Sequence, residues 1–106
     1  MERRTDVIRA EDLSMLGRYT AWRATPHGYE VFQLCSELAG RLVERGFKHY
    51  GCAAIIQTAR WHYSIKHGPD AEGYKVNNNY EPYLSREMTE RQIVPEGFFR
   101  TRKTRA

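Results

Sequence analysis

The sequence has few cysteines and no long hydrophobic run. Only Cys35 and Cys52 are present among its 106 residues, and both fall within apolar helical patterns. A free thiol in such a position behaves as a small hydrophobic group, so we do not expect a disulfide-stapled scaffold. A membrane-spanning helix needs about 20 consecutive apolar residues, and the polar N-terminus is followed by no such run. These features predict a cytoplasmic protein without membrane association.

The sequence also lacks the spacings on which common active sites depend. His62 and His67 are five residues apart, which places them about 140° from each other around a helix and prevents shared metal ligation. Neither Gly46 nor Gly51 is followed by the Lys-Ser/Thr pair of a phosphate-binding loop, and no carboxylate cluster suits magnesium. We therefore expect a protein that is not an enzyme and that uses no metal or cofactor.

The sequence does contain enough apolar material for one folded domain. Hydrophobic residues make up 41% of the chain and charged residues 28%, with seven Tyr, four Phe and two Trp. Burial of this mixture can offset chain entropy, whereas two domains within this length would each be too small to fold alone. We expect a single domain over residues 1–106, with a loosely ordered N-terminal arm (about 1–12) and a basic C-terminal tail (about 103–106).

Apolar periodicity predicts a helix from Tyr29 to Arg45 and a second helix from about Tyr50 to Lys66. Gly46 is placed to end the first helix as a left-handed C-cap, and Gly68 and Pro69 end the second. The second helix is apolar around most of its circumference, because Trp61, Ala54 and Ile65 widen the side formed by Cys52, Ile55, Ile56, Ala59, His62 and Tyr63. It is therefore expected to be the central helix.

A third helix is expected over about residues 80–92. Asn79, or failing that Asn78, is suited to cap it, because the amide oxygen can accept hydrogen bonds from the free backbone N–H groups of the first turn. Pro82 is also tolerated in that turn. Extended pieces from Tyr74 to Val76 and from Phe98 to Arg102 bracket this helix and predict a small two-stranded β-ribbon. The expected fold class is mainly α, a three-helix core with a small β-ribbon and a winged-helix-like outline.

The chain before Tyr29 is expected to be an arm that packs on the helices. A short helix is expected from Arg9 to Leu16, Pro26 and Gly28 mark a turn, and Trp22 anchors the arm. The core is expected to consist of apolar residues from all three helices: Leu34, Leu38, Leu42, Ile55, Ile56, Ala59, Leu84 and Met88.

The segment from Gly73 to Tyr80 and the end of the chain are rich in groups that bind nucleic acids. Asn amides pair with base edges, Tyr rings stack on bases, and basic side chains neutralise phosphates. Residues Gly97 to Ala106 alone account for the net charge of +4. The predicted nucleic-acid-binding residues are Lys75, Asn77, Asn78, Tyr80, Arg86, Arg100, Arg102 and Lys103. The same features also fit a capped turn and a solubilising tail.

The block from Phe47 to Arg102 resembles a family of small phage and prophage proteins. The resemblance is carried by a Gly-aromatic-Lys-x-Asn-Asn-Asn stretch at Gly73 to Asn79, a Tyr-rich helix and a Gly-Phe-Phe-x-x-Arg ending at Arg102. Arg60, Trp61, Tyr83, Arg86 and Met88 belong to the same block. The resemblance implies an accessory protein of a mobile element and assigns no catalytic residue.

Two functions follow from these features. The leading prediction is a nucleic-acid-binding accessory protein of a phage or mobile element, which contacts mainly the phosphate backbone of DNA or RNA. The alternative is a phage factor that docks on a host enzyme or defence complex through exposed aromatic anchors such as Trp22, Trp61 or Tyr83. A positive face joining Lys75 and Arg86 to the basic end favours the first function. An exposed aromatic patch without such a face favours the second.

Overall fold

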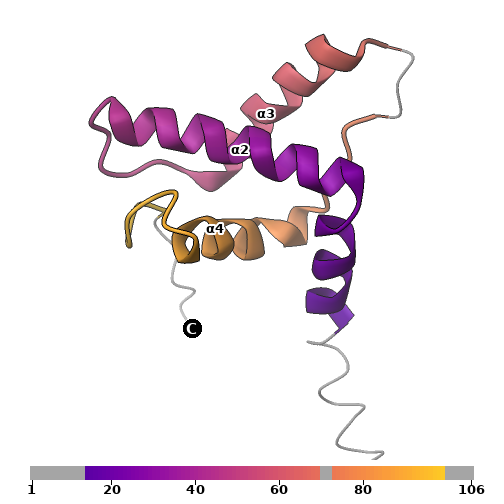
Figure 1. Ribbon diagram of the computed structural model, residues 1–106, viewed down its shortest axis with the longest axis horizontal. Helices are drawn as coiled ribbons and strands as arrows, with labels where there is room; N and C mark the ends of the chain where they lie inside the picture. Colours follow the sequence, from indigo (N-terminus) through magenta and orange to yellow (C-terminus); the bar gives the residue numbers. More distant parts are fainter. Residues whose placement is uncertain (1–13, 70–72, 100–106) are drawn as a thin grey trace, which may run out of the picture.

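The computed structural model describes residues 14–69 and 73–99, and most of them are helical (Figure 1). Residues 14–23 form a helix that runs across the direction of α2 (Pro26–Glu44). A loop leads to α3 (Cys52–His67), and a short 3-10 helix, η1 (Asn78–Tyr80), continues into α4 (Glu81–Glu90). Helix α3 packs against both α2 and α4. The mainly α part of the expected fold class is confirmed.

The expected β-ribbon is wrong, because residues 14–69 and 73–99 contain no strand. The chain at both proposed ribbon segments uses its side chains and backbone groups elsewhere. Tyr74 is buried and its hydroxyl donates to the Ile56 carbonyl (2.8 Å). Phe98 is fully buried, its N–H donates to Pro95 O, and its carbonyl accepts from Tyr50 N–H. Long-range packing therefore replaces the ribbon and the winged-helix outline; Arg100 to Arg102 lie outside the described residues.

Helix α2 begins earlier than the apolar pattern suggests. Thr25 is its N-cap, since the Thr25 hydroxyl oxygen accepts from Gly28 N–H (3.0 Å), and Pro26 occupies the first turn. The turn expected at Pro26 and Gly28 is thus confined to residues 24–25. Of the short helix expected from Arg9 to Leu16, the described residues 14–16 are helical, and this helix continues to residue 23. The loosely ordered arm expected over about residues 1–12 lies outside the described residues. Trp22 packs against the core as expected.

The end of α2 matches the prediction. Gly46 has a left-handed φ of 99°, its N–H donates to Val43 O, and Phe47 N–H donates back to Leu42 O. This pair of bonds is a Schellman motif. Gly68 likewise has a positive φ of 78° at the end of α3.

The start of α4 differs from the prediction that Asn79 caps the helix. Asn77 caps η1 instead, because its side-chain oxygen accepts from Asn79 N–H (2.8 Å). Tyr80 precedes α4 without any side-chain capping bond, and Pro82 lies in the first turn as expected. A turn of 3-10 helix moves the capping position two residues upstream of the expected one.

The core confirms part of the expected set. Ile55, Ile56, Ala59, Leu84 and Met88 are buried, whereas Leu34, Leu38 and Leu42 are only partly buried. Helix α2 is rotated about its axis, so that Val31 and Cys35 of the predicted apolar pattern are buried together with Phe32 and Ala39. Tyr19, Tyr80, Val94 and Phe98 complete the core from outside α2 and α3. Trp61 and Ile65 do not widen the buried side of α3, since they are 62% and 67% exposed.

Candidate nucleic-acid interface

A small hollow of about 120 Å³ lies between α3 and residues 73–80, which we call the Asn-rich segment. We call it the Asn hollow. Its lining residues come from α3 and from the chain leading into α4: Ala53, Ile56, Gln57, Arg60, Tyr74, Val76, Asn77, Asn78 and Glu81. The fold therefore places Gln57 and Arg60 of α3 opposite Asn77 and Asn78, which are remote from them in sequence.

The Asn-rich segment is held in position by its neighbours on the N-terminal side. Tyr74 is anchored under α3 by its hydroxyl bond to Ile56 O. His27 of α2 also holds the segment: its Nε2 accepts from Lys75 N–H (3.1 Å), and its Nδ1 lies 3.1 Å from the Tyr63 hydroxyl. Nε2 also lies 3.2 Å from Lys75 O, so His27 contacts both backbone polar groups of Lys75. Both anchors place the start of the segment against the helices.

The Asn hollow presents several hydrogen-bond donors to solvent. The Arg60 guanidinium carbon lies 5.2 Å from the centroid of the Tyr74 ring, and within residues 14–69 and 73–99 Arg60 forms no ion pair. Gln57, Asn77 and Asn78 are exposed. Arg matches the geometry of phosphate oxygens, and amide side chains read base edges. The hollow can thus bind a phosphate or the edge of a base.

The structure distributes the predicted site residues over several places. Asn77 and Asn78 lie together in the Asn hollow, and exposed Lys75 precedes them in the chain. Tyr80 is in the core, with its ring centroid 5.0 Å from that of Trp22, so it is not available to stack on a base. Arg86 lines a different hollow. The last three predicted residues, Arg100, Arg102 and Lys103, lie outside the described residues.

Sequence reasoning missed Gln57 and Arg60 as site residues. The helical pattern places both on the exposed strip of α3, and Arg60 belongs to the block that carries the resemblance. Neither signal indicates that these side chains face the Asn-rich segment. Only the crossing of α3 with the chain after Gly73 brings them there.

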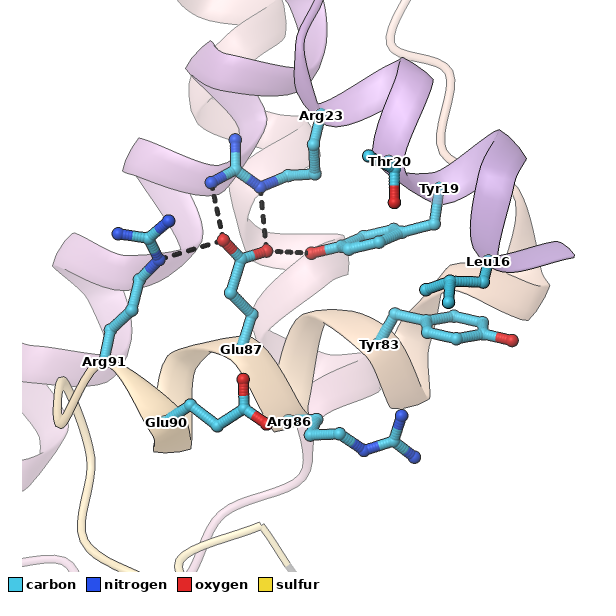
Figure 2. Close-up of a pocket in the computed structure, with 9 residues that line it drawn as sticks. All are labelled: Leu16, Tyr19, Thr20, Arg23, Tyr83, Arg86, Glu87, Glu90 and Arg91. Atoms are coloured by element: carbon cyan, nitrogen blue, oxygen red, sulfur yellow. Dashed lines mark hydrogen bonds and ion pairs between the residues drawn. The ribbon is translucent and has the colours of Figure 1, made fainter. Parts of the chain in front are cut away.

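A second hollow, of about 490 Å³, lies between the helix of residues 14–23 and α4. Figure 2 shows Arg23, Tyr19 and Arg91 pointing toward the carboxylate of Glu87, one of the lining residues. Arg23 donates from Nε (2.9 Å) and Nη2 (2.8 Å), Arg91 donates from Nε (2.9 Å), and the Tyr19 hydroxyl donates a short hydrogen bond.

This Glu87 cluster is electrostatically satisfied. Burial alone would raise the pKa of Glu87, but hydrogen bonds from Arg23, Tyr19 and Arg91 outweigh burial and lower the pKa to about 2. Burial and the adjacent Glu87 carboxylate raise the pKa of Tyr19. The carboxylate is thus permanently ionised at neutral pH and the phenol stays protonated. The cluster holds the helix of residues 14–23, here called the N-terminal helix, against α4. Neither Glu87 nor Tyr19 exchanges a proton near pH 7.

Other kinds of site have little support in residues 14–69 and 73–99. Within these ranges no group of three His, Cys, Asp or Glu side chains is placed to hold a metal ion. None of the helices described there combines the length and the apolar character needed to cross a bilayer. Compared with models of protein families, with curated proteins and with solved structures, the chain matches none of them.

Proposed function

We propose that this protein binds nucleic acid through the Asn hollow and Lys75, as a cytoplasmic accessory protein of a phage or other mobile element. The observation that carries the proposal is the convergence of Arg60 and Gln57 with Asn77 and Asn78. A guanidinium and side-chain amides form a combination suited to phosphate and base edges, and the exposed Lys75 precedes the two Asn residues in the chain.

The dimensions of the Asn hollow limit what it binds. At about 120 Å³ it is large enough to hold a phosphate group or the edge of one base, but it is too small for a base pair. Glu81 is the one acidic residue of its lining, and its carboxylate can accept from an exocyclic amino group. Arg60 and Lys75 then contact the backbone, which makes the binding dependent on salt.

The test is fluorescence anisotropy with labelled duplex DNA, single-stranded DNA and RNA of the same sequence over a range of salt concentrations. The native chain should bind weakly at low salt and lose affinity at physiological salt. The double variant Arg60→Gln, Lys75→Gln removes two phosphate contacts. On duplex DNA, each lost contact should reduce the slope of log affinity against log salt concentration by about 0.9, so the slope should become less steep by about 1.8.

A matched control has the same change in net charge elsewhere. Arg41→Gln, Arg45→Gln removes two basic side chains that line a separate groove, described below, and should leave affinity and slope close to those of the native chain. Absence of binding at low salt refutes the proposal. So does an equal loss in both double variants, because that result would indicate net charge alone.

A second candidate function, docking on a partner protein, is favoured by the surface of α3. Trp61 is 62% exposed, whereas Arg86 lines the hollow beside Glu87 and Lys75 lines neither that hollow nor the Asn hollow. We propose Trp61 as the anchor for such a partner, because exposed Trp side chains are frequent hot spots of interfaces.

A further inference from the structure

An apolar groove of about 230 Å³ runs between α2 and α3. Its lining comes from both helices and the loop between them: Leu38, Arg41, Leu42, Arg45, Tyr50, Ile55 and Thr58. The lining contains two arginines and no acidic residue. Thr58 is about 200° from Arg60 around α3, so the groove and the Asn hollow lie on different sides of this helix.

The apolar surface continues from the groove along α3. Thr58, Trp61 and Ile65 are spaced by three and four residues, so they share one exposed face of the helix. Trp61 and Ile65 are 62% and 67% exposed, the highest values among the large apolar side chains of the described residues. Large apolar side chains that are exposed on one helix face beside an apolar groove are typical of an interaction site.

We propose that this groove and the exposed face of α3 formed by Thr58, Trp61 and Ile65 bind an acidic amphipathic helix of a partner protein. This inference rests on the second function proposed above and is independent of nucleic-acid binding. The partner helix would carry apolar residues at three- and four-residue spacing, which form a ridge along one side. Such a ridge can pack into the groove between α2 and α3 and along the exposed face of α3 that carries Trp61. The bound helix would lie with its apolar ridge against Leu38, Leu42 and Trp61.

Charge complementarity determines the chemistry of the partner. Arg41 and Arg45 are one helical turn apart on the groove wall, and within residues 14–69 and 73–99 neither forms an ion pair. Acidic residues flanking the apolar ridge of the partner would pair with them. A second copy of this chain is disfavoured, because a two-fold interface would bring the same arginines together in a molecule of net charge +4.

The experiment titrates the full ¹⁵N-labelled chain with two designed helical peptides. Both carry the same Leu ridge; one has Glu and the other Lys at the flanking positions. The acidic peptide should cause saturable shifts of the Trp61 indole N–H and of the Leu38, Leu42 and Thr58 amides, and the basic peptide should not. Arg41→Gln, Arg45→Gln should weaken the acidic peptide roughly 2- to 30-fold, as expected for two exposed charge pairs.

The Arg60→Gln, Lys75→Gln variant is the control and should bind the acidic peptide like the native chain. Equal affinity for the two peptides would show that the surface binds apolar helices without a preference for acidic ones, and would overturn the proposal of an acidic partner. Absence of saturable shifts at the four signals overturns both. Analytical ultracentrifugation of the free chain tests for a dimer. If the native chain is a dimer and Trp61→Ser is a monomer, the surface binds a second copy of the chain, and the inference is also overturned. None of these outcomes affects the oligonucleotide measurements.

Discussion

At the scale of single residues, Glu87 makes the largest set of side-chain contacts that connects distant parts of the chain. It joins Tyr19 and Arg23 of the N-terminal helix to Arg91 beyond α4. Glu87→Gln keeps the shape but removes the charge, and should reduce the free energy of unfolding by roughly 1.5–3 kcal/mol, the range for hydrogen bonds to charged groups. Urea denaturation measures this change. Glu90→Gln, on the same helix and exposed, should change stability by less than about 0.5 kcal/mol.

The lowered pKa of Glu87 also predicts how stability depends on pH. The folded-state pKa is about 2 and the ordinary value is 4.5, so the unfolded chain binds a proton more readily than the folded one. The contribution of this group is complete above pH 4.5 and is lost as pH falls toward 2. The stability difference between the native chain and Glu87→Gln should therefore shrink over this interval. A difference that stays constant from pH 6 to pH 2 would contradict the assigned role.

At the scale of elements, the junction between the N-terminal helix and α2 depends on Gly28. A Cβ built there would lie 1.9 Å from the Trp22 carbonyl oxygen, a backbone atom that cannot move alone. Gly28→Ala should therefore destabilise the protein by about 1–3 kcal/mol or more. Gly40→Ala in the same helix meets no atom within 4 Å and should stabilise it by about 0.5–1 kcal/mol. Thermal denaturation of the two variants should show shifts of opposite sign; destabilisation of both would contradict the steric explanation.

Element ends were predictable where their signals are local. Gly46 and Gly68 adopt the positive φ that helix termination at these points requires, and both were identified from the sequence. The cap at Asn77 was missed, since three consecutive Asn residues offer the same local chemistry and only the intervening 3-10 turn selects one of them. Thr25 was missed as the cap of α2, because the apolar pattern does not extend back to it.

At the scale of the whole molecule, the two cysteines report on cooperative packing. Cys35 and Cys52 are free and buried, and burial raises the pKa of each thiol to about 12. Thiolate is the reactive form, so the folded protein should resist a thiol reagent such as Ellman's reagent near pH 8. Both thiols should react once denaturant unfolds the chain. Rapid reaction of either thiol under native conditions would show that the α2–α3 core opens locally.

The sequence alone determined the helical class, the two longer helices, the free thiols and the presence of Asn77, Asn78 and Lys75 in a polar segment. These features depend on residues within a few positions of one another, so periodicity and capping chemistry reveal them. Only the tertiary structure decided which face of α2 is buried, because Leu38 and Cys35 are both apolar and the choice depends on what packs opposite.

The tertiary structure also decided how the extended pieces and the site are arranged. Tyr74 and Phe98 bury their rings in the core instead of pairing as strands, and the same packing of Tyr74 under α3 brings Arg60 to the Asn-rich segment. Burial of an aromatic ring is worth roughly 1.5–3 kcal/mol. That is more than an isolated short ribbon can supply, since a two-stranded hairpin is marginally stable in water. Contacts between residues far apart in sequence leave no local pattern, and for that reason the Asn hollow could not be read from the sequence.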